Sequence, residues 1–480
     1  MQRKFLINLL LFLGLNLLIK PLWIFGIDRT VQNTVGSDVY GMYFVLFNFS
    51  LIFNMLLDFG ITNFNNCNIA RSNDFLHSGF SRIFTLKLLL GLFYMLFVLV
   101  AGWVVGYDAC QYKLLIPLII NQFLAGFILY LRSNISGLLM FKTDSLLSVA
   151  DRIVMIICCS VLLWGNVMET SFQIEWFIYA QTFSYLFTIL IALPLVLRKT
   201  SLKSPYIDYP FFKQILIQSL PFALLALLTS LHNRTDAIFL ERLLPSGLGA
   251  EEAGIYASAF RLLDAAIIIA YLFSVLLMPM FSRMIAEKTA VNSLVKTSFT
   301  LIFIYGVMLA TVSYYYSYDL MNVLYDDHIK ESSSVFKILM LSIAPLSATY
   351  ILGSLLTANG NLKKLNIIAL LAMCINVGLN LLLIAHYKAV GTAIASLCTQ
   401  LFIITAEIIL AVKIFSLKIT KTYVIRLCCF LLSTVFAGWL SLQLPFDWKI
   451  NFIVMICLCG CFVFVFGLVK IKEIVLLMKK

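Results

Sequence analysis

The sequence predicts an all-α polytopic membrane protein with about fourteen transmembrane helices. Of its 480 residues, 62% are hydrophobic and only 12% are charged, and the mean hydropathy is +0.98. Apolar stretches long enough to cross a bilayer follow one another from Phe5 to Val469, separated by short polar joints. Because one transmembrane helix needs about 20 mostly apolar residues, fourteen helices account for nearly the whole chain.

Helices rather than a barrel are expected because a membrane-spanning strand needs only about ten alternating residues, and these stretches are longer. The expected spans are residues 5–28, 38–63, 80–106, 112–133, 146–166, 172–198, 211–240, 252–281, 292–316, 333–357, 364–386, 389–412, 422–444 and 450–469. The first stretch runs past Leu18 without a small-residue cleavage site, so we expect a retained helix rather than a signal peptide.

The distribution of Lys and Arg predicts the orientation. With the N-terminus inside, the inner joints and both termini hold 23 of these residues and the outer joints hold six. Cytoplasmic loops carry such an excess of positive charge. We therefore expect a multi-pass membrane protein with both termini in the cytoplasm.

The longest inner joint, from about Arg198 to Lys213, predicts a boundary between two halves because it carries four positive charges and two prolines. We expect two six-helix lobes related by pseudo-two-fold symmetry, followed by two additional helices. The expected divisions are 1–200 for the N-terminal lobe, 201–416 for the C-terminal lobe and 417–480 for the added helices.

An internal repeat supports this division. A shift of 213 residues places Asp28-Arg29 on Glu241-Arg242 and Gly41-Met42-Tyr43 on Gly254-Ile255-Tyr256. Such a parallel duplication relates the halves by an axis along the membrane normal and places a substrate between them.

Ionisable residues within the spans are the best indicators of function, since a charge at mid-bilayer costs about 2.5–3.5 kcal/mol. Lys20, Arg234 and Arg261 all fall in the outer half of the membrane, and Arg29 and Arg242 continue the positive charge at the rim. Together these five could line one basic chamber. Arginine binds phosphate oxygens through two parallel hydrogen bonds, so the pattern indicates an anionic substrate.

Four acids inside spans are candidates for ion coupling: Asp58, Asp236, Asp264 and Glu407. Asp264 lies three residues from Arg261, and a structural ion pair explains both equally well. Glu407 has no basic neighbour within a turn, which leaves open a buried protonated acid or a site for a coupling cation. Lys87, Asp151, Arg152 and Lys337 lie nearer span ends, where we expect the side chains to snorkel to the interface.

Prolines and absent motifs add two expectations. Pro21, Pro221, Pro279 and Pro345 lie inside spans and predict kinked helices. The sequence has no nucleotide-binding GxxxxGK[ST], no HExxH and no outer loop long enough for a reaction centre, which argues against an enzyme. Basic residues do not cluster with aromatics, so we expect no nucleic-acid partner.

Several segments resemble the polysaccharide flippases of the multidrug/oligosaccharidyl-lipid/polysaccharide exporter superfamily, which export O-antigen and capsule repeat units. These segments are Asn233–Asp236, Ala253–Arg261, the related Gly41–Tyr43 and Val390–Ala395. The resemblance covers the six-plus-six-plus-two arrangement of spans. It implies a V-shaped transporter of two helical lobes.

The resemblance also implies a function. Such a flippase moves oligosaccharide linked to undecaprenyl diphosphate from the inner to the outer leaflet by alternating access, with Lys20, Arg234 and Arg261 as counterparts of the cavity cations. It implies no bound cofactor, coupling to a proton or sodium gradient, and a monomer whose partners are the lipid-linked glycan, membrane lipids and the polysaccharide polymerase machinery. The alternative is a multidrug or organic-cation antiporter of the same superfamily, against which the cavity cations argue.

Overall fold

The computed structural model describes residues 14–62, 65–66, 69, 74–138, 140–165, 171–200, 207–245, 247–417 and 420–468, and within these ranges every regular element is helical. The chain divides into two compact units, Met1–Gly254 (unit 1) and Ile255–Lys480 (unit 2). The predicted lobe boundaries at residues 200 and 416 stay a prediction.

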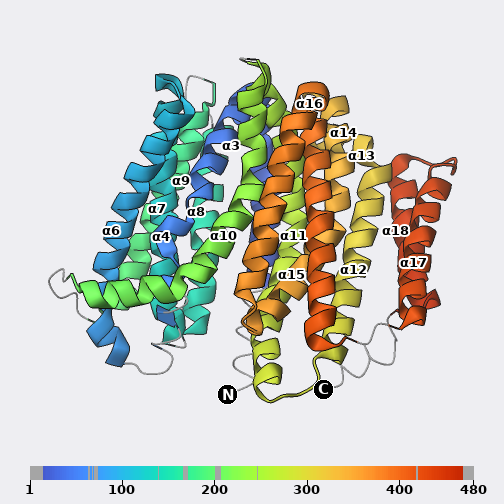
Figure 1. Ribbon diagram of the computed structural model, residues 1–480. Helices are drawn as coiled ribbons and strands as arrows, with labels where there is room; N and C mark the ends of the chain where they lie inside the picture. The colour runs from blue at the N-terminus through green and yellow to red at the C-terminus, as the bar shows by residue number, and fades with distance from the viewer. Residues whose placement is uncertain are drawn as a thin grey trace. The chain divides into compact units, whose positions relative to one another are not determined.

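In its described residues, unit 1 contains a π-helix, eight α-helices and the start of α11 (Figure 1). The elements are η1 (Trp23–Asp28), α2 (Arg29–Val35), α3 (Ser37–Ile52), α4 (Met55–Asp58), α6 (Asp74–Val105), α7 (Ala109–Gly137), α8 (Phe141–Trp164), α9 (Ile174–Leu197), α10 (Tyr209–Leu243) and α11 (Leu248–Ala286).

Unit 2 contains most of α11 and the remaining helices. These are α12 (Asn292–Tyr315), α13 (Ser317–Leu324), α14 (Ile329–Leu339), the short 3₁₀ helix η2 (Met340–Ser342), α15 (Ile343–Ala358), α16 (Leu362–Phe415), α17 (Lys421–Ser441) and α18 (Trp448–Val465).

The helices confirm the prediction of an all-α multi-pass membrane protein. Within the described ranges, ten helices are long and apolar enough to span a membrane, and the bent α10 makes eleven. One of the ten is α16, which merges the predicted spans 364–386 and 389–412. Its two halves meet at Lys388, where φ 50° and ψ −131° interrupt the helix at the predicted joint, and they lie side by side in Figure 1.

The surface of these helices suits a lipid environment. Large apolar side chains such as Trp103, Val104 and Leu382 are 69–75% exposed. In the most apolar window of α6, only 28% of the residues are buried inside the protein. Such surfaces are stable where the surroundings are acyl chains rather than water.

The predicted span 38–63 is not a continuous helix. α3 ends at Ile52, and α4 adds a single turn that ends at Asp58. Phe59 then adopts a left-handed conformation with φ 45°, and Gly60 follows with φ 77°. A break of this kind leaves backbone carbonyls without helical partners inside the membrane, so other groups must satisfy them.

Three of the predicted proline kinks coincide with irregular helix geometry. The π-helix η1 begins two residues after Pro21, and η2 interrupts the helix just before Pro345. α10 bends by 57° between Tyr209–Ile217 and Leu220–Leu243, next to Pro221 (Figure 1). Pro279 lies within α11 without an interruption of the helix. Loss of the proline N–H and its ring clash account for the bends.

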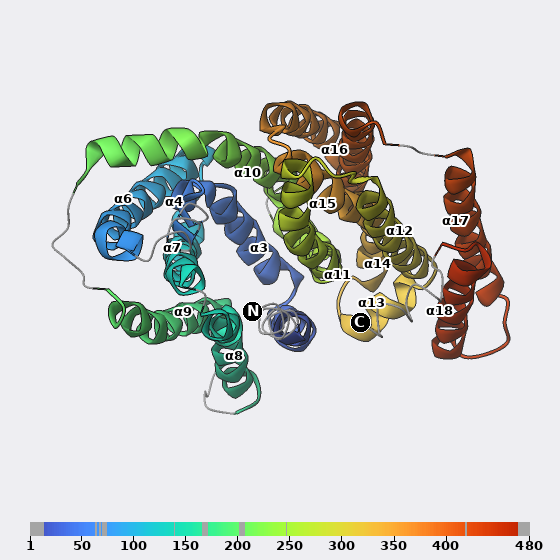
Figure 2. The ribbon, with the colours of Figure 1, turned by 90° about the horizontal axis from the view of Figure 1, so that it is seen from below.

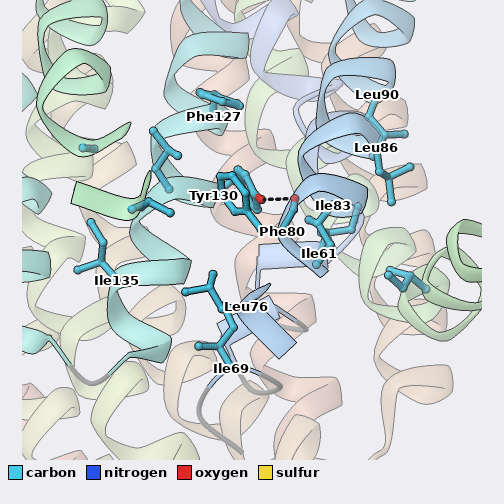
Figure 3. Packing of buried hydrophobic residues seen from close by; sticks show 14 of the residues in the cluster. Ile61, Ile69, Leu76, Phe80, Ile83, Leu86, Leu90, Phe127, Tyr130 and Ile135 are labelled. Carbon is cyan, nitrogen blue, oxygen red and sulfur yellow. Dashed lines mark hydrogen bonds between the residues drawn. The ribbon is translucent and has the colours of Figure 1, made fainter. Parts of the chain in front are cut away.

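The core of unit 1 joins α6, α7 and the ends of α9 and α10. Phe80 of α6 stacks on Tyr130 of α7 with ring centroids 6.1 Å apart. The Tyr130 hydroxyl donates to the Phe80 carbonyl oxygen at 3.2 Å, as the dashed line in Figure 3 shows. Leu76, Ile83 and Leu86 extend this cluster along α6. The packing holds α6 against α7 and so fixes the walls of the cavity described below.

Within unit 1, α3 and the start of α11 meet at glycines that the 213-residue repeat makes equivalent. A Cβ on Gly41 would lie 1.9 Å from the Ala250 carbonyl oxygen, and one on Gly254 would lie 1.8 Å from the Ser37 carbonyl oxygen. Ala250 and Gly254 are the residues that the shift places on Ser37 and Gly41. Reciprocal pairs of this kind are what two-fold related segments make, so the contact supports the repeat.

Unit 2 also relies on small residues where its helices meet. α12 packs closely on α15 at Gly306, where a Cβ would lie 2.7 Å from the Ala344 Cα. α17 approaches Tyr315 of α12 at Gly438. Figure 2 shows α17 and α18 side by side next to α12, as their contacts require. Small residues let membrane helices approach closely enough to pack.

Candidate functional site

Unit 1 contains a cavity of about 430 Å³ at the break between α3 and α4, which we call the unit 1 cavity. From α10, Ala226, Ser230 and Arg234 face it, since residues spaced by four share one helix face. The remaining lining residues come from α3, α4, α7 and the segments next to them: Leu51, Asn54, Met55, Leu57, Asp58, Thr62, Gly126 and Leu129. The cavity therefore combines an apolar wall with one cation, one carboxylate and several neutral polar groups.

Arg234 supplies the cation. Its Nη1 donates to Asn48 Oδ1 of α3 at 3.2 Å. Asn48 is 1% exposed, and its Nδ2 donates to the Phe44 carbonyl oxygen at 2.7 Å, so its amide oxygen is turned toward the guanidinium. This neutral amide helps to position the guanidinium. The predicted role of Arg234 in binding the substrate stays a prediction.

Asp58 supplies the carboxylate, and it is paired with Lys87 of α6. Lys87 Nζ donates to Asp58 Oδ1 and, at 3.0 Å, to the Leu57 carbonyl oxygen. The hydroxyl and the backbone N–H of Thr62 also donate to Asp58 Oδ1. Lys87 thus pairs with the acid and also donates a hydrogen bond to a backbone carbonyl oxygen at the end of α4.

The expectation that Lys87 snorkels is wrong. Its side chain is only 3% exposed, whereas that of Asp58 is 35% exposed and lines the cavity. Burial of an ammonium group is tolerated here because an acid and a carbonyl oxygen replace its water. The helix break between α3 and α4 creates this site. The sequence around Lys87 contains no local pattern that predicts the ion pair.

Arg242, predicted at the rim of a basic chamber, is bound by neighbouring groups of unit 1. Its Nε lies 2.8 Å from Glu241 Oε2, and its guanidinium stacks 4.5 Å from the Tyr107 ring centroid. Gln111 bridges the pair, donating to Glu241 Oε1 at 2.9 Å and accepting from Arg242 Nη2 at 3.4 Å. Burial, with the Glu241 charge adding to it, raises the pKa of the Tyr107 hydroxyl, which lies in the joint between α6 and α7.

Lys20 and Arg29 lie on the N-terminal elements. Lys20 is half-buried and within electrostatic range of Asp151 and Arg152 of α8. The Arg152 guanidinium stacks 5.6 Å from the Trp23 ring, and Asn16 Nδ2 donates to Ser148 Oγ at 3.2 Å. Arg29 begins α2, and its buried Nε has no hydrogen-bond partner in the described part of the chain.

Neither Lys20, Arg29 nor Arg242 is among the described residues that line the unit 1 cavity. Arg261 lies in unit 2, half-buried on α11. The single basic chamber formed by all five cations therefore stays a prediction.

The other three predicted acids are not among the described residues that line the unit 1 cavity. Asp236 is 1% exposed on α10, and Asp264 is half-buried on α11, one turn from Arg261. Glu407 is 4% exposed on α16 and faces α15, where a Cβ on Gly353 would lie 3.5 Å from its Oε1. Its Oε2 has no hydrogen-bond partner among the described residues. The predicted structural or coupling role of Glu407 stays a prediction.

A set of buried amides in unit 2 was missed by reasoning from charge alone. Asn376 and Asn380 of α16 are 0% exposed, and Asn380 Nδ2 donates to the Asn376 carbonyl oxygen at 3.0 Å. Their spacing of four residues on an apolar helix was the available signal. In the part of the chain that the structure describes, no cluster of three or more His, Cys, Asp and Glu side chains could hold a metal ion.

Comparison with solved structures identifies the fold. The lipid II flippase MurJ in an inward closed conformation superposes with a TM-score of 0.69 and 14% identity, covering 96% of this chain and 98% of that chain. An inward-facing multidrug resistance MATE transporter of the MOP superfamily gives 0.64 and 15%, covering 85% and 94%. A MOP superfamily transporter from Pyrococcus furiosus, described as having a binding pocket of reverse polarity, gives 0.56 and 13%, covering 85% and 94%.

Sequence comparison adds the family. No curated protein matches the chain. The family model described as "Polysaccharide biosynthesis protein" matches residues 12–285, which is more than half of the chain and includes the whole unit 1 cavity. The chain is therefore a multi-pass membrane protein with the fold of MOP superfamily transporters, and it belongs to the polysaccharide biosynthesis protein family.

Proposed function

We propose that the protein is a flippase that moves an oligosaccharide linked to undecaprenyl diphosphate from the inner to the outer leaflet of a bacterial cytoplasmic membrane. Membership of the polysaccharide biosynthesis family supports the glycan, and a fold shared with a lipid II flippase supports a lipid-linked substrate. The observation that carries the proposal is the Arg234 guanidinium on the wall of the unit 1 cavity.

The chemistry of the substrate explains why such a cavity is needed. A diphosphate-sugar head loses its hydration in hydrocarbon, which costs far more free energy than thermal motion supplies. Arg234 offers a guanidinium that binds phosphate oxygens through paired hydrogen bonds. Asn54, Ser230 and Thr62 line the same cavity and provide neutral donors and acceptors for sugar hydroxyls. The polyprenyl tail remains in the surrounding lipid.

The Asp58–Lys87 pair gives this site a means of coupling to a proton or sodium gradient. Asp58 lines the cavity together with the cation proposed to bind the substrate, and Lys87 makes an ion pair with it. A proton or cation that displaced Lys87 from Asp58 would change the charge of the cavity. It would also break the hydrogen bond from Lys87 to the Leu57 carbonyl oxygen at the end of α4. The ion gradient then drives the alternating exposure of the cavity to the two leaflets.

The excess of Lys and Arg in the inner joints supports a cytoplasmic position for both termini. We also propose that the protein is a monomer and that it passes its product to polymerase machinery.

The competing candidate is a multidrug or organic-cation antiporter, which the MATE fold and the Asp58 carboxylate in the cavity favour. Lys87 opposes this reading because it already neutralises Asp58. Arg234 adds a guanidinium to the wall of the cavity, which disfavours an organic cation.

Transport by the full-length protein in proteoliposomes tests the proposal. The substrate is an undecaprenyl diphosphate-linked glycan whose sugar is oxidised by external periodate only after it reaches the outer leaflet. We expect Arg234→Ala to slow the appearance of accessible sugar by about 10–100-fold, the loss of a charged hydrogen bond of ~1.5–3 kcal/mol. Arg234→Lys should retain part of the rate.

The matched control is Arg242→Gln, which removes a guanidinium that is bound by Glu241 and Tyr107 outside the cavity. It should transport at a rate close to that of the wild type. If Arg234→Ala transports the glycan as fast as Arg242→Gln, or if the wild type transports an organic cation and not the glycan, the proposed function is wrong.

A further inference from the structure

Unit 2 contains a cavity of its own, between the ends of three helices. It has a volume of about 530 Å³, within the range of about 300–1,000 Å³ typical of ligand sites. The first two turns of α12, the last turns of α16 and the first two turns of α17 surround it. We call it the unit 2 groove.

Most of the groove is apolar. Leu352 of α15 and Ala411 of α16 form its buried floor, and Phe299 of α12 and Leu427 of α17 form its sides. Val424 of α17 also lines it and is 44% exposed, so the groove is reached from the outer surface of the helices. In a membrane protein this surface faces acyl chains, and an acyl chain is the apolar group available to fill the groove.

The groove is also lined by polar side chains, one of which is a cation. Lys296 of α12 lies 4.8 Å from the Tyr423 ring centroid, and the Tyr423 hydroxyl is 2.8 Å from Thr300 Oγ1. Among the described residues, no carboxylate lies within ion-pair distance of Lys296. The buried Asn292 Oδ1 also has no hydrogen-bond partner there, and it is a place for a hydroxyl donor.

The surrounding charge is positive as well. Lys413 near the end of α16, and Lys421 and Arg426 in the first turns of α17, are exposed close to the residues that line the groove. Basic pockets between transmembrane helices bind anionic lipid head groups. We propose that the unit 2 groove binds one anionic phospholipid of the phosphatidylglycerol type, with an acyl chain in the apolar part and its phosphate at Lys296.

This lipid has a structural consequence for unit 2. Its acyl chain contacts α12, α16 and α17 at once, and α17 and α18 follow the joint from α16. A ligand bound only by the folded protein raises its stability, by an amount that grows with the logarithm of the ligand concentration above Kd. The phospholipid therefore holds the last two helices against α12, independently of any transported substrate.

Native mass spectrometry and thermal unfolding of the full-length protein, titrated with phosphatidylglycerol or phosphatidylcholine, test this site. We expect one phosphatidylglycerol adduct of higher affinity and a rise in Tm with that lipid. Lys296→Gln should weaken the adduct about fivefold, the effect of ~1 kcal/mol per lysine at an anionic surface. It should leave phosphatidylcholine binding unchanged. Val424→Trp should fill the groove and remove the adduct.

Lys337→Gln is the matched control because Lys337 makes the same type of contact, 4.2 Å from the Tyr314 ring, away from the groove. It should bind phosphatidylglycerol like the wild type. Equal losses in Lys296→Gln and Lys337→Gln would overturn the site. So would an unchanged adduct in Val424→Trp, equal affinity for the two phospholipids, or a polyprenyl lipid as the adduct that Val424→Trp displaces.

Discussion

Replacement of Gly41 by alanine tests the close contact between α3 and the start of α11. The added Cβ would lie 1.9 Å from the Ala250 carbonyl oxygen and 2.7 Å from the Gly254 nitrogen. Both are backbone atoms, so no side-chain rotation can relieve the clash. The two helices must separate until this distance reaches at least 3.0 Å. Gly254→Ala makes the reciprocal clash with Ser37.

The size of the effect follows from two opposing contributions. Overpacking against rigid neighbours costs about 3 kcal/mol, the upper part of the usual range. Replacing glycine by alanine inside a helix returns about 1 kcal/mol. The net loss is about 2 kcal/mol, which lowers Tm by roughly 4–8 °C for a unit of this size. The double variant should lose less than the sum, because one separation accommodates both methyl groups.

Thermal unfolding of the purified full-length protein in detergent measures these losses. The control is Gly378→Ala in α16, where a Cβ would meet no atom within 4 Å. Its Tm should be unchanged or slightly higher. If Gly41→Ala and Gly254→Ala unfold at the same temperature as Gly378→Ala, the reciprocal contact is refuted.

Three further predictions concern single groups. Lys87→Met should lower the free energy of unfolding by about 2 kcal/mol, which is less than the ~3–5 kcal/mol of a fully buried pair because Asp58 is 35% exposed. Adding Asp58→Asn should recover most of the lost Tm. A double variant no more stable than Lys87→Met would contradict the ion pair. The pKa of Tyr107 is raised above its ordinary 10.0, so its contribution to stability is fully present below pH 10 and is lost as the pH rises beyond it. Tyr107→Phe should therefore flatten the decline in Tm at alkaline pH. An unchanged decline would exclude Tyr107 as its source. Lys388→Gly should raise the free energy of unfolding by about 1 kcal/mol, and with it Tm, because φ 50° and ψ −131° strain a residue that carries a side chain. A lower Tm would show that no such strain exists.

The positions of the helices could be predicted because membrane thickness fixes their length and charge fixes their joints. Lys388 illustrates this: one basic residue between two apolar stretches marked the place where α16 turns. The break after Ile52 could not be found in the same way. Its residues are as apolar as those of a continuous span, and the contact of Lys87 with the Leu57 carbonyl oxygen at the end of α4 comes from a helix remote in sequence.

The candidate site was predictable only in part, for the same physical reason. An arginine within a span indicates a polar environment by itself, which is how Arg234 was found. The state of a charge depends on partners remote in sequence: Lys87 and Asp58 are 29 residues apart, and Arg242 and Gln111 are 131 apart. Neutral lining residues such as Asn54 and Ser230 carry no distinguishing signal at all.

Binding of undecaprenyl diphosphate and of undecaprenol, the same lipid without phosphate, to the wild type and to Arg234→Ala tests the central claim most directly. The alcohol controls for folding and for binding of the tail. We predict that the wild type binds the diphosphate more tightly than the alcohol, and that Arg234→Ala reduces this preference by about 10–100-fold while its affinity for the alcohol is unchanged. A preference equal to that of the wild type in Arg234→Ala would contradict the assignment of Arg234 as the phosphate-binding group.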